Sequence, residues 1–410
     1  MFLHKHGFCC ALTKTLSISV NGLSLLENTV ILCYTILVKI SKKGDVMKIL
    51  ITGGTGVIGV ALTSALAKDA NNEIFVSSRK KRTSSFENVA YLQGNAHDTA
   101  FLNSLDHDYD AVVDLMNYTE AEAKTCIDIL TKKTKKYYFI SSCRVFGDSQ
   151  TITEDSPMLL DVTEDEAYRN TNDYALAKAR EERWLKQIPN VTILRPYITY
   201  GPERLQLSIY EKELWLWRAM KGHTTVMTDE MLNATTTITY SIDVAEAIAK
   251  LVMHGTNEAA VNLTTAESIK WKDVYQIYRD FLSAKHIDFK LKRIDSDLLI
   301  QKAFRSNKWQ LLYDRKYDRV FDNSLLLRET GMKDDAFTKA EDGLKKSLDS
   351  LIGDIKFKKI NPITNGYMDR ITREKGLSRY FSGVSKLKYV LVRYCPLPLS
   401  FVLSLIQRGS

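Results

Sequence analysis

The stretch KILITGGTGVIG, residues 48–59, joins a short apolar run to evenly spaced glycines. Residues 48–52 are typical of a first strand in a buried parallel sheet. Gly53, Gly56 and Gly59 follow, and a helical pattern begins at residue 57. Such glycines let the chain turn tightly, approach a pyrophosphate and pack a helix on a sheet, while the helix N-terminus offers free N–H groups. The stretch therefore predicts a strand–turn–helix unit that binds a dinucleotide.

The same alternation of apolar runs and helical patterns continues along the chain. Further strands are predicted at 73–77, 89–92, 111–115, 136–141, 191–195, 234–240 and 260–263. Helices are predicted at 57–69, 119–133, 173–187, 207–221, 241–254 and 270–283, with Ser241 or Asp243 capping the fifth. This order is typical of an α/β protein with a Rossmann-type, doubly wound parallel sheet.

The pattern also suggests a division into domains. Residues 47–200 form the predicted Rossmann domain, and 234–263 return to it. Residues 201–233 and 264–354 form a smaller, mixed substrate-binding part, and 355–410 a basic aromatic tail.

The net charge of +8 is unevenly distributed. Residues 1–46 carry +3 and residues 355–410 carry +9, which leaves −4 for the body between them. A mildly acidic body disfavours nucleic-acid binding.

The first 46 residues differ from the rest of the chain in their pattern of apolar and charged residues. Their apolar run at 28–40 is shorter than the ~20 residues that span a bilayer, and no signal-peptide cleavage pattern follows it. Because Met47 begins a typical first strand, we interpret 1–46 as a leader from an over-called start, with a membrane-associating extension as the alternative.

The six cysteines form neither a CxxC pair nor a ligand spacing with histidine. We therefore expect no metal site and no disulfide framework. A reducing cytoplasm is the expected location, with a peripheral membrane position as a further option.

Three further motifs follow the glycines in order. Residues 140–147 read ISSCRVFG, Tyr174 and Lys178 are four residues apart at the start of a predicted helix, and 194–196 read LRP before Gly201-Pro202. With the G-x-x-G-x-x-G spacing, these motifs resemble the extended short-chain dehydrogenase/reductases, in particular the NAD-dependent epimerase/dehydratase family. The resemblance covers about 47–350.

The resemblance implies a catalytic set of Ser142, Tyr174 and Lys178. Tyr174 would exchange a proton with a substrate hydroxyl or keto oxygen, Ser142 would hydrogen-bond that oxygen, and Lys178 would favour the phenolate and hold the nicotinamide ribose. The implied cofactor-binding residues are Gly53, Thr55, Gly56, Val57, Ile58, Gly59, Arg79, Asn95, Tyr174 and Lys178.

The expected cofactor is NADP or NAD. No acidic residue ends the second predicted strand; Arg79 begins a basic cluster there, which favours the 2′-phosphate of NADP. Asn95 occupies a position where the family often has an Asp near the adenine.

Two departures from the family pattern bear on the substrate. Cys143 and Arg144 stand where 4,6-dehydratases have an acidic pair, so dehydration is disfavoured. Ile198 replaces an Asn that contacts the diphosphate of UDP-sugars in many members. A nucleotide sugar is still the expected substrate, with Arg204 and Arg319 as candidate contacts, although solvated helix residues are an alternative interpretation of Arg204.

We therefore expect an oxidoreductase or epimerase that acts as a homodimer, with a non-catalytic Rossmann binding or scaffold protein as the alternative. The tail has two open interpretations. Its mixture of Lys, Arg and aromatic residues suits a membrane surface or a protein partner, or else an extension packed on the body.

Overall fold

The computed structural model describes residues 46–295, 307–395 and 397, so the interpretation of 1–46 lies almost entirely outside the described residues. Its centre is a seven-stranded parallel sheet in the order β13-β6-β5-β4-β1-β2-β3. The strands are β1 (Met47–Thr52), β2 (Asn72–Ser78), β3 (Val89–Gln93), β4 (Tyr109–Asp114), β5 (Thr134–Ile140), β6 (Val191–Pro196) and β13 (Ala260–Leu263). The predicted Rossmann-type fold class is confirmed.

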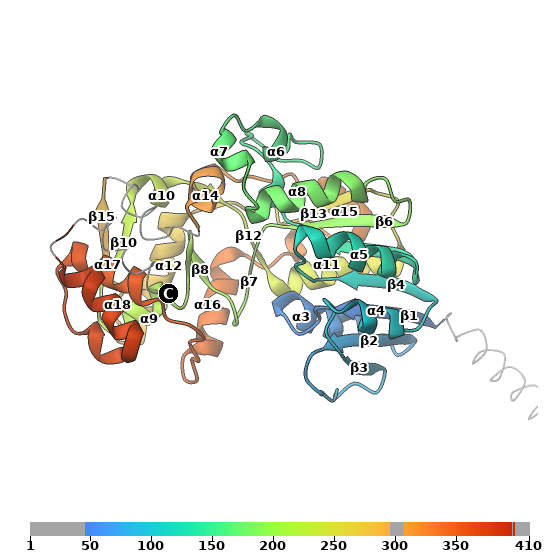
Figure 1. Cartoon of the computed structure of the whole chain (residues 1–410), viewed down its shortest axis with the longest axis horizontal. Helices are drawn as coiled ribbons and strands as arrows, with labels where there is room; N and C mark the ends of the chain where they lie inside the picture. The colour runs from blue at the N-terminus through green and yellow to red at the C-terminus, as the bar shows by residue number, and fades with distance from the viewer. Residues whose placement is uncertain (1–45, 296–306, 396, 398–410) are drawn as a thin grey trace, which may run out of the picture. The chain divides into compact units, whose positions relative to one another are not determined.

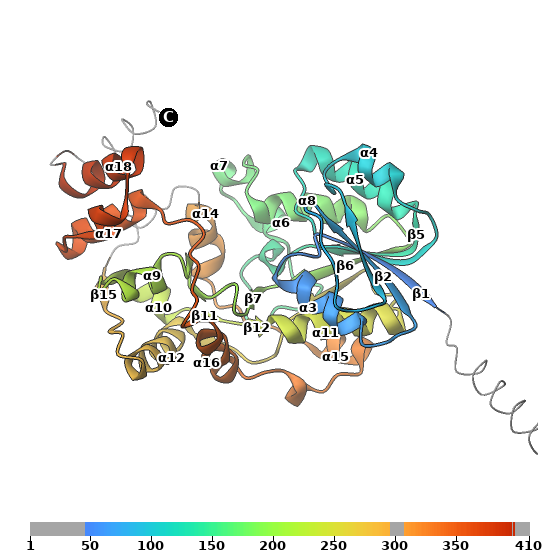
Figure 2. The same ribbon diagram turned by 90° about the horizontal axis from the view of Figure 1, so that it is seen from below.

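Helices cover both faces of the sheet, as Figure 2 shows. One face carries α4 (Thr99–Ser104), α5 (Glu120–Thr131) and α8 (Tyr174–Leu185), and the other carries α3 (Val57–Leu66), α11 (Ser241–His254) and α15 (Ser324–Thr330). Leu50, Val112 and Ile127 are fully buried between the sheet and the first of these layers. Burial on both faces explains why the strands are continuously apolar.

The predicted side-chain cap of α11 is wrong. Tyr240 occupies the cap position and offers no side-chain bond, while Ser241 is the first helical residue. Asp243 instead accepts hydrogen bonds from the backbone N–H and hydroxyl of Thr338, at 2.7 and 3.1 Å.

A second group of elements adjoins the carboxyl ends of the strands (Figure 1). It contains the short strand pairs β7 (Ile198–Tyr200) with β12 (Ile238–Tyr240), β8 (Gln206–Leu207) with β9 (Tyr210–Glu211), β10 (Thr225–Thr228) with β15 (Leu291–Ile294), and β11 (Thr235–Thr236) with β14 (Ile269–Lys270). Its helices are α9 (Trp215–Met220), α10 (Asp229–Asn233), α12 (Trp271–Ala284), α14 (Lys308–Gln310) and α16 (Ala340–Leu351). A π-helical turn, η4, spans Leu311–Arg315. Two short helices, α6 (Leu159–Val162) and α7 (Glu166–Arg169), lie between β5 and α8 in the chain.

The predicted helix at 207–221 is a hairpin followed by a short helix. Leu207 pairs with Tyr210 across a turn in which Ser208 has a positive φ of 56°, and helix α9 begins only at Trp215. A left-handed residue ends a helical path, so the apolar pattern here serves a buried hairpin.

The described part of the tail packs on the body through a helical hairpin. This C-terminal hairpin consists of α17 (Pro362–Thr372) and α18 (Gly383–Tyr394), which lie side by side in both views (Figures 1 and 2). Asp369 of α17 is fully buried, and its Oδ1 lies 2.7 Å from Arg218 Nη2 of α9 and 3.1 Å from His223 Nδ1. Tyr389 of α18 donates to its Oδ2 at 2.6 Å. We call Arg218, His223, Asp369 and Tyr389 the anchor cluster.

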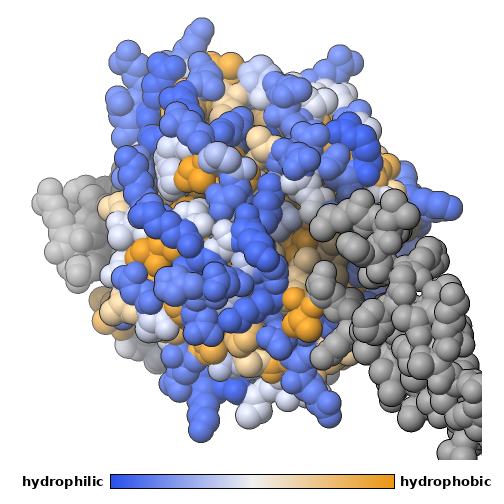
Figure 3. Space-filling model, turned by 90° about the vertical axis from the view of Figure 1, so that its right-hand side faces the viewer, coloured by the Kyte–Doolittle hydropathy of each residue, from blue (hydrophilic) through white to orange (hydrophobic). Residues whose placement is uncertain are grey.

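Within residues 46–295 and 307–395, no helix combines the length and the apolarity needed to cross a bilayer. The face that Figure 3 presents is largely hydrophilic, with apolar residues in small, separate patches.

Candidate active site

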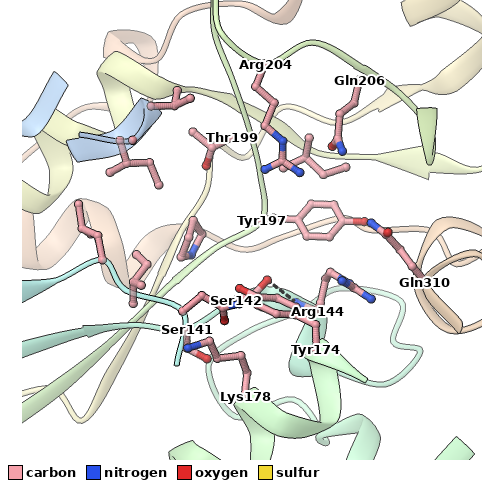
Figure 4. Close-up of a pocket in the computed structure, with 18 of the residues that line it drawn as sticks. Ser141, Ser142, Arg144, Tyr174, Lys178, Tyr197, Thr199, Arg204, Gln206 and Gln310 are labelled. Atoms are coloured by element: carbon pink, nitrogen blue, oxygen red, sulfur yellow. Dashed lines mark hydrogen bonds between the residues drawn. The ribbon is translucent and has the colours of Figure 1, made fainter. Parts of the chain in front are cut away.

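A cavity of about 490 Å³ opens at the carboxyl ends of the central strands. Residues that follow β1, β4, β5 and β6 form one part of its wall, and residues from β8, β9, α14 and η4 form the other. Figure 4 shows Ser142, Tyr174 and Lys178 on one side and Arg204 and Gln206 on the opposite side. In parallel α/β sheets this edge is the usual place for ligands.

The glycine loop adopts a shape that side chains would prevent. Gly53 has a φ of +66°, and a Cβ on Gly59 would lie 2.5 Å from the Cα of Gly54. Gly56 differs, because a Cβ there would meet only the carbonyl oxygen of Gly53, at 3.7 Å, and the residue lines the cavity. Gly53 and Gly59 hold the loop against the sheet, and Gly56 leaves space for a ligand.

A buried carboxylate fixes the neighbouring loop. Asp114, at the end of β4, accepts hydrogen bonds from the hydroxyl of Thr52 and the N–H of Met116 on one oxygen. Tyr118 and Tyr137 donate to the other oxygen. These four donors satisfy a fully buried group and connect the end of β4 with the end of β1, the middle of β5 and the loop that follows β4.

The three predicted catalytic residues line the same cavity. Ser142 follows β5, and its Oγ accepts a hydrogen bond from the backbone N–H of Arg144 at 3.3 Å. Tyr174 is the first residue of α8, whose N-cap is Asp173, and Lys178 lies one turn further along. The helix thus presents Tyr174 and Lys178 to the strand end that carries Ser142.

Lys178 forms a buried ion pair with Glu181, in which Nζ lies 2.9 Å from Oε2. Burial raises the pKa of the Glu181 carboxyl, although the Lys178 ammonium opposes the shift. Lys178 Nζ also lies 4.3 Å from the centre of the Phe139 ring, and apart from Glu181 it has no hydrogen-bond partner within the described residues. Its N–H donors and the space at Gly56 fit a dinucleotide whose ribose hydroxyls would accept from Lys178.

Arg144 lines the cavity, although in the sequence it stands out only as a departure from the family pattern. Its guanidinium carbon lies 5.3 Å from the centre of the Tyr174 ring, and its nitrogens lie 3.6 Å from Asp173 and 3.5 Å from Asp314. Burial opposes ionisation of Asp314, but the cations Arg315, Arg319 and Arg144 outweigh it and lower the pKa of this carboxyl. Arg144 thus lies close to the Tyr174 ring, and its charge is balanced by Asp173 and Asp314.

The structure brings only one of the two candidate substrate residues to the cavity. Arg204 lines it and pairs with Glu211 at 3.2 Å. Arg319 is fully buried elsewhere, where it binds Asp314 and the carbonyl oxygens of Phe146 and Gly147. Because its N–H groups donate to these buried acceptors, Arg319 holds in place the segment of chain that follows Ser142.

The predicted cofactor residues divide in the same way. Gly53, Gly56, Val57, Ile58 and Gly59 line the cavity. Thr55 lines a separate groove beside α3 and α11, and Arg79 and Asn95 are exposed residues that the described cavity does not include.

The sequence did not predict several residues that line the cavity, because these residues come from segments that lie far apart in the chain. They are Tyr197, Gln206, Glu211, Asn307, Gln310 and Arg315. Arg315 carries the clearest signal: it belongs to a charged run at 314–319 that includes Asp314 and Arg319.

The parallel sheet, its glycine loop and the cavity at the strand ends define a Rossmann enzyme of the extended short-chain dehydrogenase/reductase class. The chain belongs to the NAD-dependent epimerase/dehydratase family, whose model matches residues 49–264. A search of curated proteins finds no match.

Solved structures with the same fold share little sequence with this chain. A UDP-N-acetylglucosamine 4-epimerase from Methanobrevibacter ruminantium, solved with UDP-N-acetylmuramic acid, is 18% identical, with a TM-score of 0.56 over 76% of this chain and 100% of that one. A dTDP-glucose 4,6-dehydratase from Bacillus anthracis, solved with NAD, is 15% identical, with a TM-score of 0.56 over 76% and 98%. A UDP-glucuronic acid 4-epimerase from Bacillus cereus is 16% identical, with a TM-score of 0.54 over 74% and 98%. At these identities the likeness establishes the fold.

Proposed function

We propose that this protein is an NAD(P)-dependent oxidoreductase or epimerase that acts on a hydroxyl- or keto-bearing carbon of a nucleotide sugar. The observation that carries the proposal is that Ser142, Tyr174 and Lys178 line one cavity with the glycine loop. That arrangement would place a substrate oxygen and a dinucleotide in the same enclosed space.

Each catalytic residue has a distinct task in this proposal. Tyr174 takes the proton from the substrate hydroxyl during oxidation and returns it during reduction. Ser142 donates a hydrogen bond to the same oxygen, and Lys178 holds the ribose. The bound cofactor supplies the hydride acceptor and donor.

Dehydration is a poor match for this cavity. Glu211 is the one carboxylate among the described residues that line it, and it lies on the wall opposite Tyr174, already paired with Arg204. Elimination of water would need an acid and a base beside the reacting carbon, where this chain has Cys143 and Arg144. Cys143 is fully buried, and burial raises the pKa of its thiol.

The cofactor preference that we propose is NADP. β2 ends at Ser78, and the following Arg79, Lys80, Lys81 and Arg82 are all exposed and basic. A guanidinium at this place suits a 2′-phosphate, while no carboxylate is present to bind a 2′-hydroxyl.

The test combines cofactor binding with one substitution. Titration of the full chain with NADH and NADPH should show binding, tighter for NADPH, and a thermal-shift screen of nucleotide sugars should then identify a substrate. Tyr174→Phe should lower turnover about 10²–10⁴-fold with cofactor affinity retained, because it removes only the proton-transfer group.

Two results would contradict the proposal. Failure of the native chain to bind either dinucleotide would favour the non-catalytic alternative. Undiminished turnover by Tyr174→Phe would reject the role assigned to Tyr174. Tyr138→Phe is the matched control, because Tyr138 is a buried tyrosine of β5 whose hydroxyl donates to the carbonyl oxygen of Leu251 and which does not line the cavity.

A further inference from the structure

Exposed apolar side chains are concentrated at the C-terminal end of the described chain. Among the residues that the structure describes, eleven large hydrophobic ones are exposed, and five of them lie between 380 and 397. They are Tyr380, Val384, Leu387, Tyr394 and Leu397, with exposed fractions of 42, 67, 58, 47 and 42%. Scattered exposed apolar residues are ordinary, but such a concentration marks an interaction surface.

Most of these residues lie on one face of α18. Val384, Leu387, Leu391 and Tyr394 are spaced by three, four and three residues, which places them along a single stripe of a helix. The opposite face buries Tyr389 and Val392 against the rest of the protein. The contacts to the body leave Val384, Leu387 and Tyr394 exposed, while Leu391 between them is partly buried. We call these four residues the α18 stripe.

The exposed charge nearest to the stripe in the chain is basic. Every exposed charged side chain among residues 355–395 is Lys or Arg, and those nearest to α18 are Arg373, Lys375, Arg379 and Lys386. Lys356 and Lys358 are also exposed, but they pair with Asp354 and Glu203. The two acidic residues of this segment face inward, because Asp369 belongs to the anchor cluster and Glu374 accepts from Thr224.

We propose that the α18 stripe docks on an anionic membrane surface, with the helix lying in the plane of the interface. Apolar side chains would enter the boundary of the acyl chains, and the surrounding Lys and Arg would meet lipid phosphates. Twelve residues of α18 span about 18 Å, too short to cross a core of about 30 Å. A lipid surface is favoured over a protein groove because the exposed charged residues nearest to α18 in the chain, at 373, 375, 379 and 386, are all basic.

Docking in this way leaves the candidate active site open. None of the described residues that line the cavity belongs to the segment 355–395. Membrane binding and turnover can therefore be measured separately, and the inference does not rest on the proposed chemistry.

The experiment is co-sedimentation of the full chain with vesicles of phosphatidylcholine alone or mixed with phosphatidylglycerol. We expect binding to the anionic vesicles, little binding to the neutral ones, and release as salt rises from about 0.1 to 1 M, where screening is strong. Val384→Ser with Leu387→Ser should weaken binding by about tenfold or more, because two side chains no longer enter the bilayer boundary.

The matched control is Val60→Ser with Ile242→Ser, which changes two residues on α3 and α11 that are 54 and 51% exposed. It should bind vesicles like the native chain, and both double variants should keep the native melting temperature. Equal losses in the two variants, unchanged binding by the α18 variant, or no binding to anionic vesicles would overturn the proposal. Self-association without lipid that the α18 variant abolishes would also overturn it, because the stripe would then be a protein interface.

Discussion

Arg195 and Glu182 form an ion pair directly behind the strand end that carries Ser142. Both side chains are fully buried, and Arg195 Nη2 lies 2.6 Å from Glu182 Oε2. Ser141 donates to the same carboxylate, and Arg195 also donates to the carbonyl oxygen of Glu154. The pair therefore links β6, α8 and the residue before Ser142. Its cost in desolvation is offset only while both charges and their hydrogen bonds are present.

Removing one member of this pair should strongly destabilise the protein. Arg195→Met leaves Glu182 buried without a counter-ion, so the free energy of unfolding should fall by about 3–5 kcal/mol in urea denaturation. The double variant Glu182→Leu with Arg195→Met should recover most of that loss, since no charge stays buried. A double variant no more stable than Arg195→Met would show that packing, rather than the uncompensated charge, causes the loss.

The sequence indicated Ser142, Tyr174 and Lys178 because each lies in a short local motif. Arg319 shows where local patterns fail: it was a candidate substrate contact, but the fold surrounds it with Asp314 and three carbonyl oxygens. Glu181, which pairs with Lys178, is equally hidden in sequence, because a helix with many charged residues gives no sign of which face is buried.

The strand–turn–helix unit at 47–66 is set by local sterics. A Cβ on Gly59 would meet backbone atoms of Gly54, which cannot move aside as a side chain could. A Cβ on Gly56 meets nothing closer than 3.7 Å. The two glycines therefore serve different needs, close packing of α3 for one and ligand space for the other.

Alanine substitutions should separate these two needs. Gly59→Ala should lower the free energy of unfolding by about 1–3 kcal/mol, since the added methyl overpacks a rigid contact. Gly56→Ala should fold with nearly native stability but bind NAD(P)H more weakly, because its methyl occupies ligand space. Calorimetric binding and urea denaturation of both variants measure the difference; equal behaviour would contradict it.

The element predictions were accurate where the pattern was strong and local. The seven strands of the sheet appear within a few residues of their predicted positions, because burial on both faces demands apolar runs. The predicted helix at 207–221 failed because the β8–β9 turn uses Ser208 rather than a glycine or asparagine, so no turn signal interrupts the apolar pattern.

The C-terminal hairpin shows how distant segments complete one structure. Arg218 and His223 come from the body, while Asp369 and Tyr389 come from α17 and α18. From the sequence, the tail could be a surface for a membrane or partner, or an extension packed on the body. No local pattern pairs Arg218 with Asp369, so the sequence did not decide between these two interpretations. The structure combines features of both: one face of α18 is packed, and the other is exposed.

The anchor cluster should make stability depend on acid pH. Burial opposes ionisation of Asp369, but His223, Arg218 and Tyr389 outweigh it and hold its pKa below the ordinary value of 3.8. Its contribution to folding is therefore fully present above about pH 5, and it is lost as pH falls through 3.8 toward the folded pKa.

Urea denaturation between pH 7 and pH 3 measures this dependence. Asp369→Asn should cost about 3 kcal/mol at pH 7 and flatten the acid dependence, because Arg218 loses its buried counter-ion at every pH. Glu374 accepts from Thr224, and its pKa is also lowered, so a residual slope from this group is expected. An Asp369→Asn profile as steep as the native one would contradict the assignment.

The anchor cluster also has a consequence for synthesis. Arg218 precedes Asp369 by 151 residues, so at ~5–20 residues per second it leaves the ribosome roughly 8–30 s before its counter-ion. Throughout that interval a guanidinium destined for the interior has no carboxylate to receive it. The nascent chain can form the Rossmann sheet early, but the surface that receives α17 must wait, exposed to chaperones, until the last helices are made.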